Sequence, residues 1–369
     1  MKLHQNEFNY RVRYWNPSLN YQKIRFDILQ AVDNVFLAGN LILGEEVEKF
    51  EKKLAEFTGT KYAVGLNSGT DALYLSLRAL GIGPGDEVIT VSNTFIASIS
   101  EIAKVGATPI LVDIGENYLM DSKEVLKAVT SKTKAIIPVH LSGDMVDLSK
   151  LPKNIPIIED AAQSLGASKN GCKAGAGGKV GCFSFYPAKI FGAFGDAGAI
   201  VTDDEEIYRK ILSLRDHNLI GKKLGAKEFG VNSRLDEVQA AILNVKFEYL
   251  RAYLLNRESA ASTYEKNLMG IPQIILPFKN KGRVWQDYII RAERRDELAE
   301  FLDKEGIKVR GHDLFLNHKY DLFDREFILP RTEKYSNEFL RLPFSSEITE
   351  KEILFVTSRI KKFYEKNII

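Results

Sequence analysis

From residue 62 onward, short apolar runs alternate along the chain with stretches whose apolar residues recur at helical spacing. Residues 70–80 show the helical pattern, because Leu73, Leu77 and Leu80 fall on one face. Short strands separated by such helices are typical of an α/β fold built on a mostly parallel sheet. The runs that predict strands are Tyr62–Leu66, Glu87–Val91, Pro109–Asp113, Ala135–Val139, Pro156–Glu159, Cys182–Phe185 and Ala199–Thr202.

The pattern changes after about residue 250. Up to that point, residues 235–250 predict a helix with one buried stripe of Leu235, Val238, Ile242 and Val245. Beyond it we predict a half-exposed strand at 284–292, a helix at 296–305, an extended segment at 307–310 and an amphipathic helix at 351–364. This indicates a smaller C-terminal α+β domain. We therefore expect an N-terminal segment at residues 1–38, a large domain at residues 39–250 and a small domain at residues 251–369.

Length and composition exclude several classes of protein. At 369 residues the chain can form two domains with ample cores. Its 51 Lys and Arg residues nearly balance its 49 Asp and Glu residues, so nucleic acid is not an expected partner. No apolar run suits a membrane span, and the first residues have no signal-peptide pattern. The two cysteines lack disulfide-framework or zinc-ligand spacing, and the five histidines are scattered. We expect a cytoplasmic protein without a metal site.

Lys189 is the first candidate for chemistry. It lies between two predicted strands, among apolar and small residues, in the segment Ser184–Gly198. An amine in a partly desolvated pocket loses its proton more readily, which a lysine that forms a Schiff base requires. The alternative is a loop lysine whose amine reaches water, which for a lysine taken alone is far commoner.

Asp160 strengthens the catalytic interpretation of Lys189. It follows an apolar strand, and open α/β sheets bind ligands at the carboxyl ends of their strands. A carboxylate there could partner the pyridinium nitrogen of pyridoxal 5′-phosphate (PLP). One alternative is that Asp160 caps a following helix. Another is a carboxylate dyad or metal pair with Glu159, which is disfavoured because adjacent strand residues point to opposite faces.

Residues 67–70, Asn-Ser-Gly-Thr, lie between a predicted strand and a predicted helix. The N–H groups at the start of a helix make an anion site, and a small residue lets the anion approach closely. Gly69 and Thr70 are therefore candidates to bind a phosphate group. The alternative is simple capping of the helix by Ser68 or Thr70.

Together these motifs resemble the DegT/DnrJ/EryC1/StrS family of PLP-dependent sugar aminotransferases, which have the fold type I architecture. The likeness runs from about Gly39 to the C-terminal helix. It rests on five segments in family order, namely Asn67–Ala72, Glu159–Gln163, the Lys189 segment, Gly195–Gly198 and Val231–Glu237. The resemblance implies a large domain with a mostly parallel seven-stranded sheet and a smaller C-terminal α+β domain, with residues 1–38 joining the small domain.

The resemblance also implies cofactor contacts. Gln163 matches the residue that hydrogen-bonds the hydroxyl of the cofactor ring, and Ser184 matches a serine that contacts its phosphate. Phe95 matches a side chain that stacks on the pyridine ring, although a core phenylalanine is the alternative in a chain with 21 of them. Asn232 matches an asparagine that reaches the cofactor phosphate of the partner subunit, which implies a homodimer.

Substrate contacts are implied for Tyr186, His312 and His318. His312 lines up with a family loop that usually reads His-Tyr-Pro, with a second histidine downstream that His318 matches. Here Asp313 and Leu314 replace the Tyr-Pro pair, so the shape of this loop departs from the family pattern.

The implied activity is a PLP-dependent aminotransferase that acts on a nucleotide-linked ketosugar, with L-glutamate as donor and Lys189 and Asp160 as catalytic residues. Tyr186-Pro187 and residues 192–196 resemble the branch that aminates C-3, which favours a dTDP-linked 3-keto-6-deoxyhexose. The alternatives are a C-4 ketosugar aminotransferase, another reaction on the same fold, and a non-catalytic role. Dehydratases of the family carry histidine at the position of Lys189, which argues against dehydration.

Overall fold

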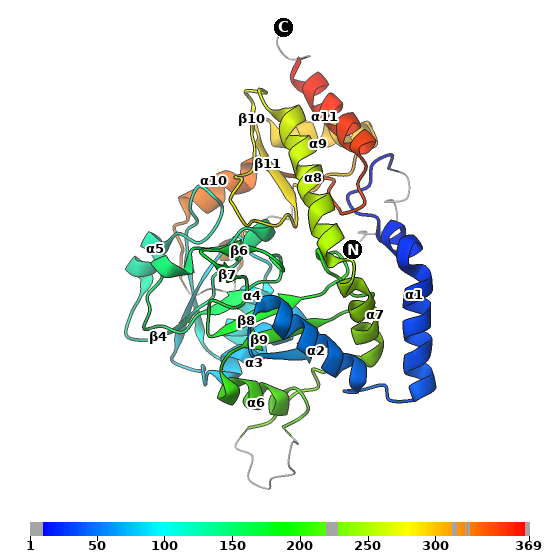
Figure 1. Cartoon of the computed structure of the whole chain (residues 1–369). Coiled ribbons are helices and arrows are strands. Elements are labelled where there is room, and N and C mark those ends of the chain that lie inside the picture. Colours follow the sequence, from blue (N-terminus) through cyan, green and yellow to red (C-terminus); the bar gives the residue numbers. More distant parts are fainter. Residues whose placement is uncertain (1–9, 219–227, 312–315, 322, 324, 366–369) are drawn as a thin grey trace.

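A twisted sheet lies at the centre of the larger part of the molecule (Figure 1). The computed structural model describes residues 10–218, 228–311, 316–321, 323 and 325–365. Four strands follow one another in the order β1-β9-β8-β5 and three in the order β3-β2-β4. Isolated parallel bridges, Ile136 to Ile157 and Val139 to Asp160, connect β4 with β5. The strands are β1 Tyr62–Leu66, β2 Glu87–Val91, β3 Thr108–Val112, β4 Thr133–Ile136, β5 Ile158–Asp160, β8 Val180–Ser184 and β9 Gly198–Thr202.

Strand β9 is the antiparallel member of this sheet. It pairs antiparallel with β1 and β8, whereas β2 pairs parallel with β3 and β4, and β5 with β8. The chain therefore leaves the carboxyl end of β8, forms the loop that carries Lys189, and returns directly as the neighbouring strand. In the register, Gly198 lies opposite both Leu66 and Ser184. The ends of β1 and β8 thus meet where the lysine loop begins.

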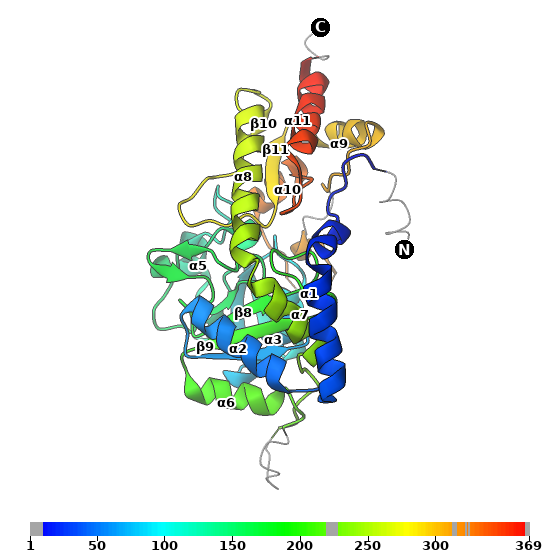
Figure 2. The ribbon, with the colours of Figure 1, turned by 45° about the vertical axis from the view of Figure 1, so that its right-hand side comes forward.

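Helices cover both faces of the sheet, as a largely parallel sheet requires (Figure 2). Phe183 and Val201 pack with α2 and α7 on one face, whereas Cys182 and Ile200 pack with α3 and α6 on the other. Helix α1 lies along α7, and residues of both helices share a further buried cluster. The helices are α1 Pro17–Ala38, α2 Glu45–Thr58, α3 Gly69–Ala79, α4 Ala97–Lys104, α5 Ser122–Ala128, α6 Glu205–Leu214 and α7 Glu237–Phe247.

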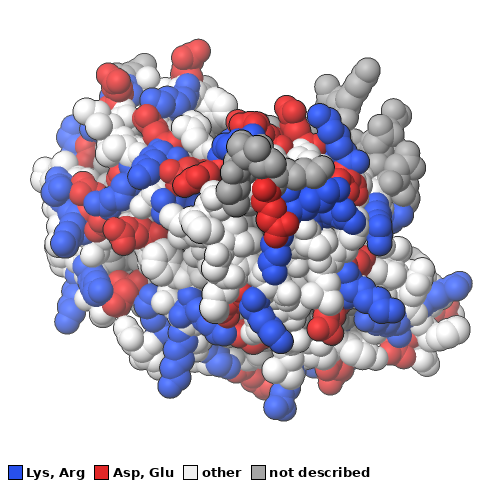
Figure 3. Space-filling model, turned by 90° about the horizontal axis from the view of Figure 1, so that it is seen from above, with Lys and Arg blue, Asp and Glu red and all other residues white. Residues whose placement is uncertain are grey.

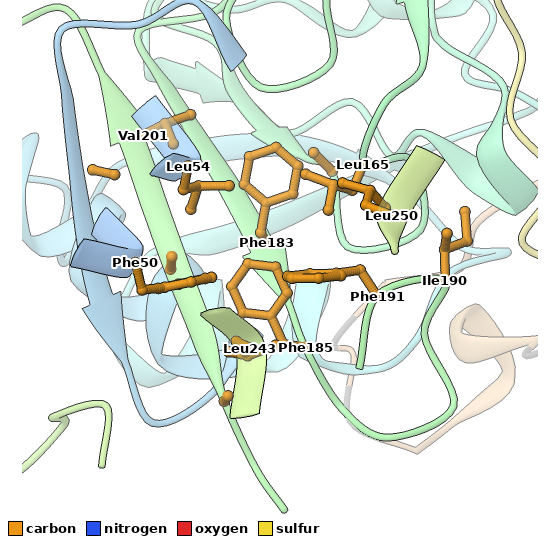
Figure 4. Close-up of a cluster of buried hydrophobic side chains, with 14 of the residues drawn as sticks. Phe50, Leu54, Leu165, Phe183, Phe185, Ile190, Phe191, Val201, Leu243 and Leu250 are labelled. Atoms are coloured by element: carbon orange, nitrogen blue, oxygen red, sulfur yellow. The ribbon is translucent and has the colours of Figure 1, made fainter. Parts of the chain in front are cut away.

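Aromatic rings pack directly beneath the lysine loop (Figure 4). Phe185 and Phe191, on either side of Lys189, are both fully buried, and their ring centroids lie 5.7 Å apart in an edge-on arrangement. Phe50 of α2 meets Phe185 edge-on at 5.3 Å. Burial of a phenylalanine stabilises a fold by about 1.5–3 kcal/mol. The loop is therefore anchored to the core at both ends.

A second buried cluster forms the smaller part of the molecule at the top of Figure 1. It packs α8, α9 and α11 against a three-stranded antiparallel sheet in the order β10-β11-β12. The elements are α8 Leu250–Leu268, β10 Ile274–Ile275, β11 Tyr288–Ala292, α9 Arg295–Lys304, α10 Pro330–Glu338, β12 Phe339–Leu342 and α11 Glu350–Glu365. Short elements elsewhere are β6 Ser168–Lys169, β7 Cys172–Lys173 and the 3₁₀ turns Leu141–Gly143, Leu148–Lys150 and Asn317–Lys319.

The two cores share elements. Helix α8 contributes Leu250 to the first core and Tyr264 to the second. Near the N-terminus, Val12 lies in the second core and forms a parallel bridge with Ile307. Helix α1, which follows it, packs beside α7 in the larger part. The predicted α/β class, with a mostly parallel sheet and a smaller α+β part, is confirmed. The domain limits at residues 38 and 250 stay predictions.

Several predicted elements differ in extent from the observed ones, most clearly the strand at 284–292 and the helix at 235–250. The predicted strand at 284–292 begins only at Tyr288, because the preceding residues hydrogen-bond to a turn at residues 142–143 and to the lysine loop. The predicted helix at 235–250 becomes α7 and the start of α8. Its single stripe is also incomplete, because α7 buries Ile242 toward α1 and Leu243 toward the sheet.

Charged side chains of both signs are interspersed over the face seen in Figure 3. Among the described residues, no helix is both long and apolar enough to cross a membrane.

Candidate active site

Lys189 lies on a tight turn at the edge of the sheet where β8 ends. Its backbone N–H donates to the carbonyl of Tyr186 over 2.8 Å. Gly192 closes the same turn, and a Cβ atom there would lie 2.6 Å from the carbonyl oxygens of both Tyr186 and Pro187. Only a glycine permits this close approach. Lys189 on this turn is half-buried.

Burial lowers the pKa of the Lys189 amine below its ordinary value of 10.5. The carboxylates of Asp160 and Asp287 oppose this shift, and the guanidinium of Arg341 adds to it. The balance increases the fraction of neutral amine near neutral pH, which is the form that attacks a carbonyl group. This is the property that sequence analysis predicted for Lys189.

Asp160 ends β5 with its side chain buried. Its Oδ2 atom accepts a hydrogen bond of 2.6 Å from Ser98 Oγ, and its Oδ1 atom accepts one of 3.2 Å from Ala162 N. Turns follow Asp160 rather than a helix, so the helix-capping alternative is wrong. The carboxylate acts electrostatically on Lys189 and so belongs to the same site.

Glu159 points away from this site. It accepts hydrogen bonds from His140 Nε2 over 2.7 Å and from the N–H groups of Gly175, Gly177 and Gly178. Burial alone would raise the pKa of Glu159, but these bonds hold its pKa below the ordinary value. A dyad with Asp160 is therefore excluded, as the alternation of strand side chains predicted. No group of three or more His, Cys, Asp and Glu side chains within the described ranges could hold a metal ion.

The start of α3 packs tightly against the end of β8. Ser68 caps the helix by accepting from Asp71 N over 3.1 Å, so the capping alternative holds for Ser68. Gly69 is the first helical residue, and a Cβ atom there would lie 2.7 Å from the Cβ atom of Ser184. The helix N-terminus at Gly69 and Thr70 and the hydroxyl of Ser184 thus meet at one edge of the sheet, which suits an anion.

Gln163 and Phe95 lie on loops after β5 and β2. The Oε1 atom of Gln163 accepts from Ser142 N over 2.8 Å, which orients the amide. Phe95 is 55% exposed, so the alternative of a core phenylalanine is wrong. Asn232 is also exposed, and its neighbour Ser233 donates to Asn67 Oδ1 over 3.2 Å. This bond brings the segment that contains Asn232 close to the start of α3.

The three residues predicted to contact substrate differ in their surroundings. Tyr186 is 53% exposed beside Ser184. His318 is buried, and its ring nitrogens pair with Ser92 Oγ at 2.7 Å and Glu333 Oε1 at 3.1 Å. These contacts favour an anchoring role for His318, and its substrate contact stays a prediction. His312 lies outside the described residues.

Three residues of this site were not predicted from the sequence. Ser98 is bonded to Asp160, Asp287 acts on Lys189, and Gln286 bonds to the backbone on both sides of Lys189. Gln286 and Asp287 are about a hundred positions from Lys189 and are part of no recognisable motif, so the sequence offered no signal for them. Ser98 follows Phe95 by one helical turn, which was the available hint.

The residues present fit PLP, the cofactor that the resemblance implies. The site combines an amine of lowered pKa, a buried carboxylate beside it, and a helix N-terminus packed too closely on Ser184 to admit a Cβ atom. These are groups that PLP sites use for its aldehyde, its ring nitrogen and its phosphate, respectively.

Comparison with known proteins agrees with this site. The model of the DegT/DnrJ/EryC1/StrS aminotransferase family matches residues 22–361. A pleiotropic regulatory protein from Geobacillus stearothermophilus is 39% identical over 94% of this chain and 97% of its own length. The dTDP-3-amino-3,4,6-trideoxy-alpha-D-glucose transaminase of Streptomyces venezuelae is 38% identical over 96% of this chain and 97% of its own.

A solved structure also matches along nearly the whole chain. The crystal structure of S. venezuelae DesV in complex with a ketimine intermediate superposes with a TM-score of 0.92 at 38% identity. The match covers 96% of this chain and 99% of that one. The extent of these matches confirms the fold type I architecture and the predicted cofactor. This chain belongs to the DegT/DnrJ/EryC1/StrS family and is a PLP-dependent aminotransferase.

Proposed function

We propose that this aminotransferase converts a nucleotide-linked ketosugar into an amino sugar, with the new amine at C-3. The favoured substrate is a dTDP-linked 3-keto-6-deoxyhexose, and L-glutamate is the favoured donor. The observation that carries the reaction class is the amine of Lys189, whose pKa is lowered by burial, together with the buried carboxylate of Asp160 that acts electrostatically on it. The name of the S. venezuelae relative, which specifies a 3-amino sugar carried by dTDP, supports the substrate.

In this proposal each predicted residue holds one part of PLP. Gly69, Thr70 and Ser184 would bind the phosphate, and Phe95 would contact the ring. Gln163 would hydrogen-bond the ring hydroxyl, and Asp160 would partner the ring nitrogen. The bound cofactor supplies an electron sink for the bond broken at the donor carbon.

Lys189 would have two roles. Its Nζ atom would hold the cofactor, and its amine, when free, would remove and return a proton at the reacting carbon. Its lowered pKa suits both roles, because the neutral amine is required as nucleophile and as base. Ser98 holds the carboxylate of Asp160 in place by donating a hydrogen bond to it.

The reaction class is tested with Lys189→Ala. The wild-type protein with PLP should absorb visible light, and glutamate should bleach this band. The variant should lose the band and aminate no ketosugar. Lys179→Ala removes a surface lysine that pairs with Asp204 and should behave like wild type. Turnover by Lys189→Ala at the wild-type rate would refute the mechanism.

The position of amination is tested with a panel of 3-keto and 4-keto sugars, each linked to dTDP or UDP. Mass spectrometry and NMR of the products identify the carbon that gains nitrogen. We expect an amine at C-3, with the dTDP sugar preferred. An amine only at C-4 would defeat this assignment and leave the aminotransferase intact. Faster turnover of the UDP sugars would overturn the choice of nucleotide alone.

We further propose a cytoplasmic homodimer in which Asn232 serves the site of the partner subunit. Its exposed side chain supports this arrangement, and two free cysteines support a reducing compartment. Light scattering should give twice the mass of the chain. When Lys189→Ala and Asn232→Ala proteins are mixed, shared sites should restore part of the activity. An active monomer would refute the dimer.

A regulatory role is the second candidate, because the relative from G. stearothermophilus carries a regulatory name. The groups around Lys189 favour catalysis, since a non-catalytic protein has no need of an amine with a lowered pKa. Bleaching of the visible band by glutamate separates the two candidates. A band that persists in excess glutamate and ketosugar would favour regulation.

A further inference from the structure

The side chain of Gln286 hydrogen-bonds the backbone on both sides of Lys189. Its Oε1 atom accepts a hydrogen bond of 2.9 Å from Ile190 N, and its Nε2 atom donates one of 3.0 Å to Ala188 O. The side chain is only 8% exposed, so these bonds are shielded from water. One primary amide thus pairs with the residue before and the residue after the lysine, as a neighbouring strand would.

Gln286 is itself held from two directions. Arg257 of α8, which is buried, donates from Nη1 to the carbonyls of Trp285 at 3.1 Å and Gln286 at 3.0 Å. On the other side, Gln286 N donates to Ser142 O over 3.4 Å. Because Ser142 N donates to Gln163 Oε1, a chain of hydrogen bonds runs from Gln163 to the backbone beside Lys189.

We propose that Gln286 is a positioning residue that fixes the lysine loop so that the amine of Lys189 stays inside the site, beside Asp160. This inference rests on the proposed role of Lys189 as the residue that holds PLP. Gln286 touches the backbone of Ala188 and Ile190, and acts through it. It also ties the lysine to the smaller part of the molecule, because Gln286 lies just before β11.

The chemistry of the contact requires an amide. The site presents one acceptor, Ala188 O, and one donor, Ile190 N, and a glutamine satisfies both without charge. A glutamate could accept from Ile190 N, but its second oxygen would face the carbonyl of Ala188. A methionine fills a similar volume and makes neither bond.

The first test measures covalent loading rather than turnover. Cofactor-free wild-type and Gln286→Met proteins are mixed with PLP, and the visible band is followed in time. We expect Gln286→Met to load more slowly by at least about tenfold, the size expected from the loss of two hydrogen bonds. The matched control is Gln239→Met, which removes a 3.0 Å bond to Phe194 N in the same loop, away from the lysine. The control should load at the wild-type rate.

The second test is the pH profile of loading. Burial lowers the pKa of Lys189, so an amine that leaves its site should regain an ordinary, higher pKa. The loading profile of Gln286→Met should therefore move to higher pH. Gln286→Glu keeps one of the two bonds and should move the profile the same way, because its negative charge also stabilises the ammonium form. A purely structural defect would lower the amount of loaded protein without moving the profile.

Two outcomes would overturn the inference. One is a wild-type loading rate and pH profile in Gln286→Met. The other is an equal defect in Gln239→Met, which would indicate a general loosening of the loop. Reduction with borohydride, followed by peptide mass analysis, identifies the lysine that carries PLP. If that lysine is not Lys189, the proposed function fails at this residue; if it is Lys189, an unchanged profile counts against Gln286 alone.

Discussion

Ser98 hydrogen-bonds the carboxylate of Asp160, which acts electrostatically on Lys189. Its Oγ atom lies 2.6 Å from Asp160 Oδ2 and 2.8 Å from Thr94 Oγ1. Since Ser98 donates to Asp160, it can accept from Thr94, and the two hydroxyls form a short relay. A hydrogen bond to a charged group contributes about 1.5–3 kcal/mol. The relay therefore holds the buried carboxylate of Asp160 in a fixed orientation.

Replacing Ser98 should impair the reaction without unfolding the protein. We expect Ser98→Ala to lower turnover about tenfold or more, the equivalent of one charge-assisted hydrogen bond. Ser98→Thr keeps the hydroxyl and should retain most of the activity. Ser100→Ala is the control on the same helix, because Ser100 Oγ donates to its neighbour Glu101 rather than to Asp160. Steady-state kinetics of the three variants decide the matter, and a fully active Ser98→Ala would contradict the relay.

The lowered pKa of Lys189 has a consequence for the cofactor-free protein. Between that lowered pKa and the ordinary value of 10.5, the unfolded chain binds a proton that the folded chain lacks. Stability must therefore rise with pH in this window. Below it, folding must bury the ammonium group at a cost. Urea unfolding should show cofactor-free Lys189→Met to be more stable than cofactor-free wild type at neutral pH, with the difference shrinking toward pH 10.5. If the free energy of unfolding changes with pH equally in both proteins, the pKa of Lys189 is not lowered in the folded chain.

Among helices and strands, sequence patterns correctly predicted those features that depend on residues close together in the chain. The strands, the start of α3 and the opposite directions of Glu159 and Asp160 follow from spacing alone. The bonds from Gln286 to the lysine loop depend instead on how α8 and β11 pack against the sheet. No periodicity encodes such contacts. The late start of the strand predicted at 284–292 has the same cause, because residues 284–286 hydrogen-bond outside any sheet.

The junction of α3 with β8 gives a prediction for one element. In Gly69→Ala, the new Cβ atom would lie 2.7 Å from Ser184 Cβ and 3.1 Å from Ser184 Cα, so the helix start must move. We expect the affinity for PLP to fall at least about tenfold, because the N–H groups no longer converge on the phosphate. Gly83→Ala is the control, since its Cβ atom would lie 3.6 Å from Val105 O, which is an ordinary van der Waals contact. Titration of the cofactor-free variants with PLP measures the effect. If Gly69→Ala and Gly83→Ala bind PLP with equal affinity, the proposed phosphate site at the start of α3 is refuted.

At the scale of the whole molecule, the lysine lies where the two cores meet. Asp287, beside β11, acts on Lys189 of the larger part, and Tyr14 from the start of the chain donates to Asp287 Oδ1 over 2.9 Å. Three distant segments thus set the charge around one amine. Because a carboxylate raises the pKa of a nearby amine, Asp287→Asn should move the loading profile to lower pH. Tyr14→Phe keeps the carboxylate and should cause a smaller shift. A profile that moves to higher pH in Asp287→Asn would contradict this arrangement.

The loop between β8 and β9 is attached to both cores. Phe185 and Phe191 pack into the core of the larger part, and Gln286, which lies just before β11, hydrogen-bonds the loop backbone. A ligand that binds only the folded chain stabilises it by about 2.7 kcal/mol when its free concentration is a hundred times Kd. Because PLP would bind at a loop that contacts both cores, this increase in the free energy of unfolding should stabilise the whole chain rather than one part. In a cell short of vitamin B6, the empty enzyme would then unfold more often and reach proteases first. The supply of cofactor would set the abundance of this protein as well as its activity.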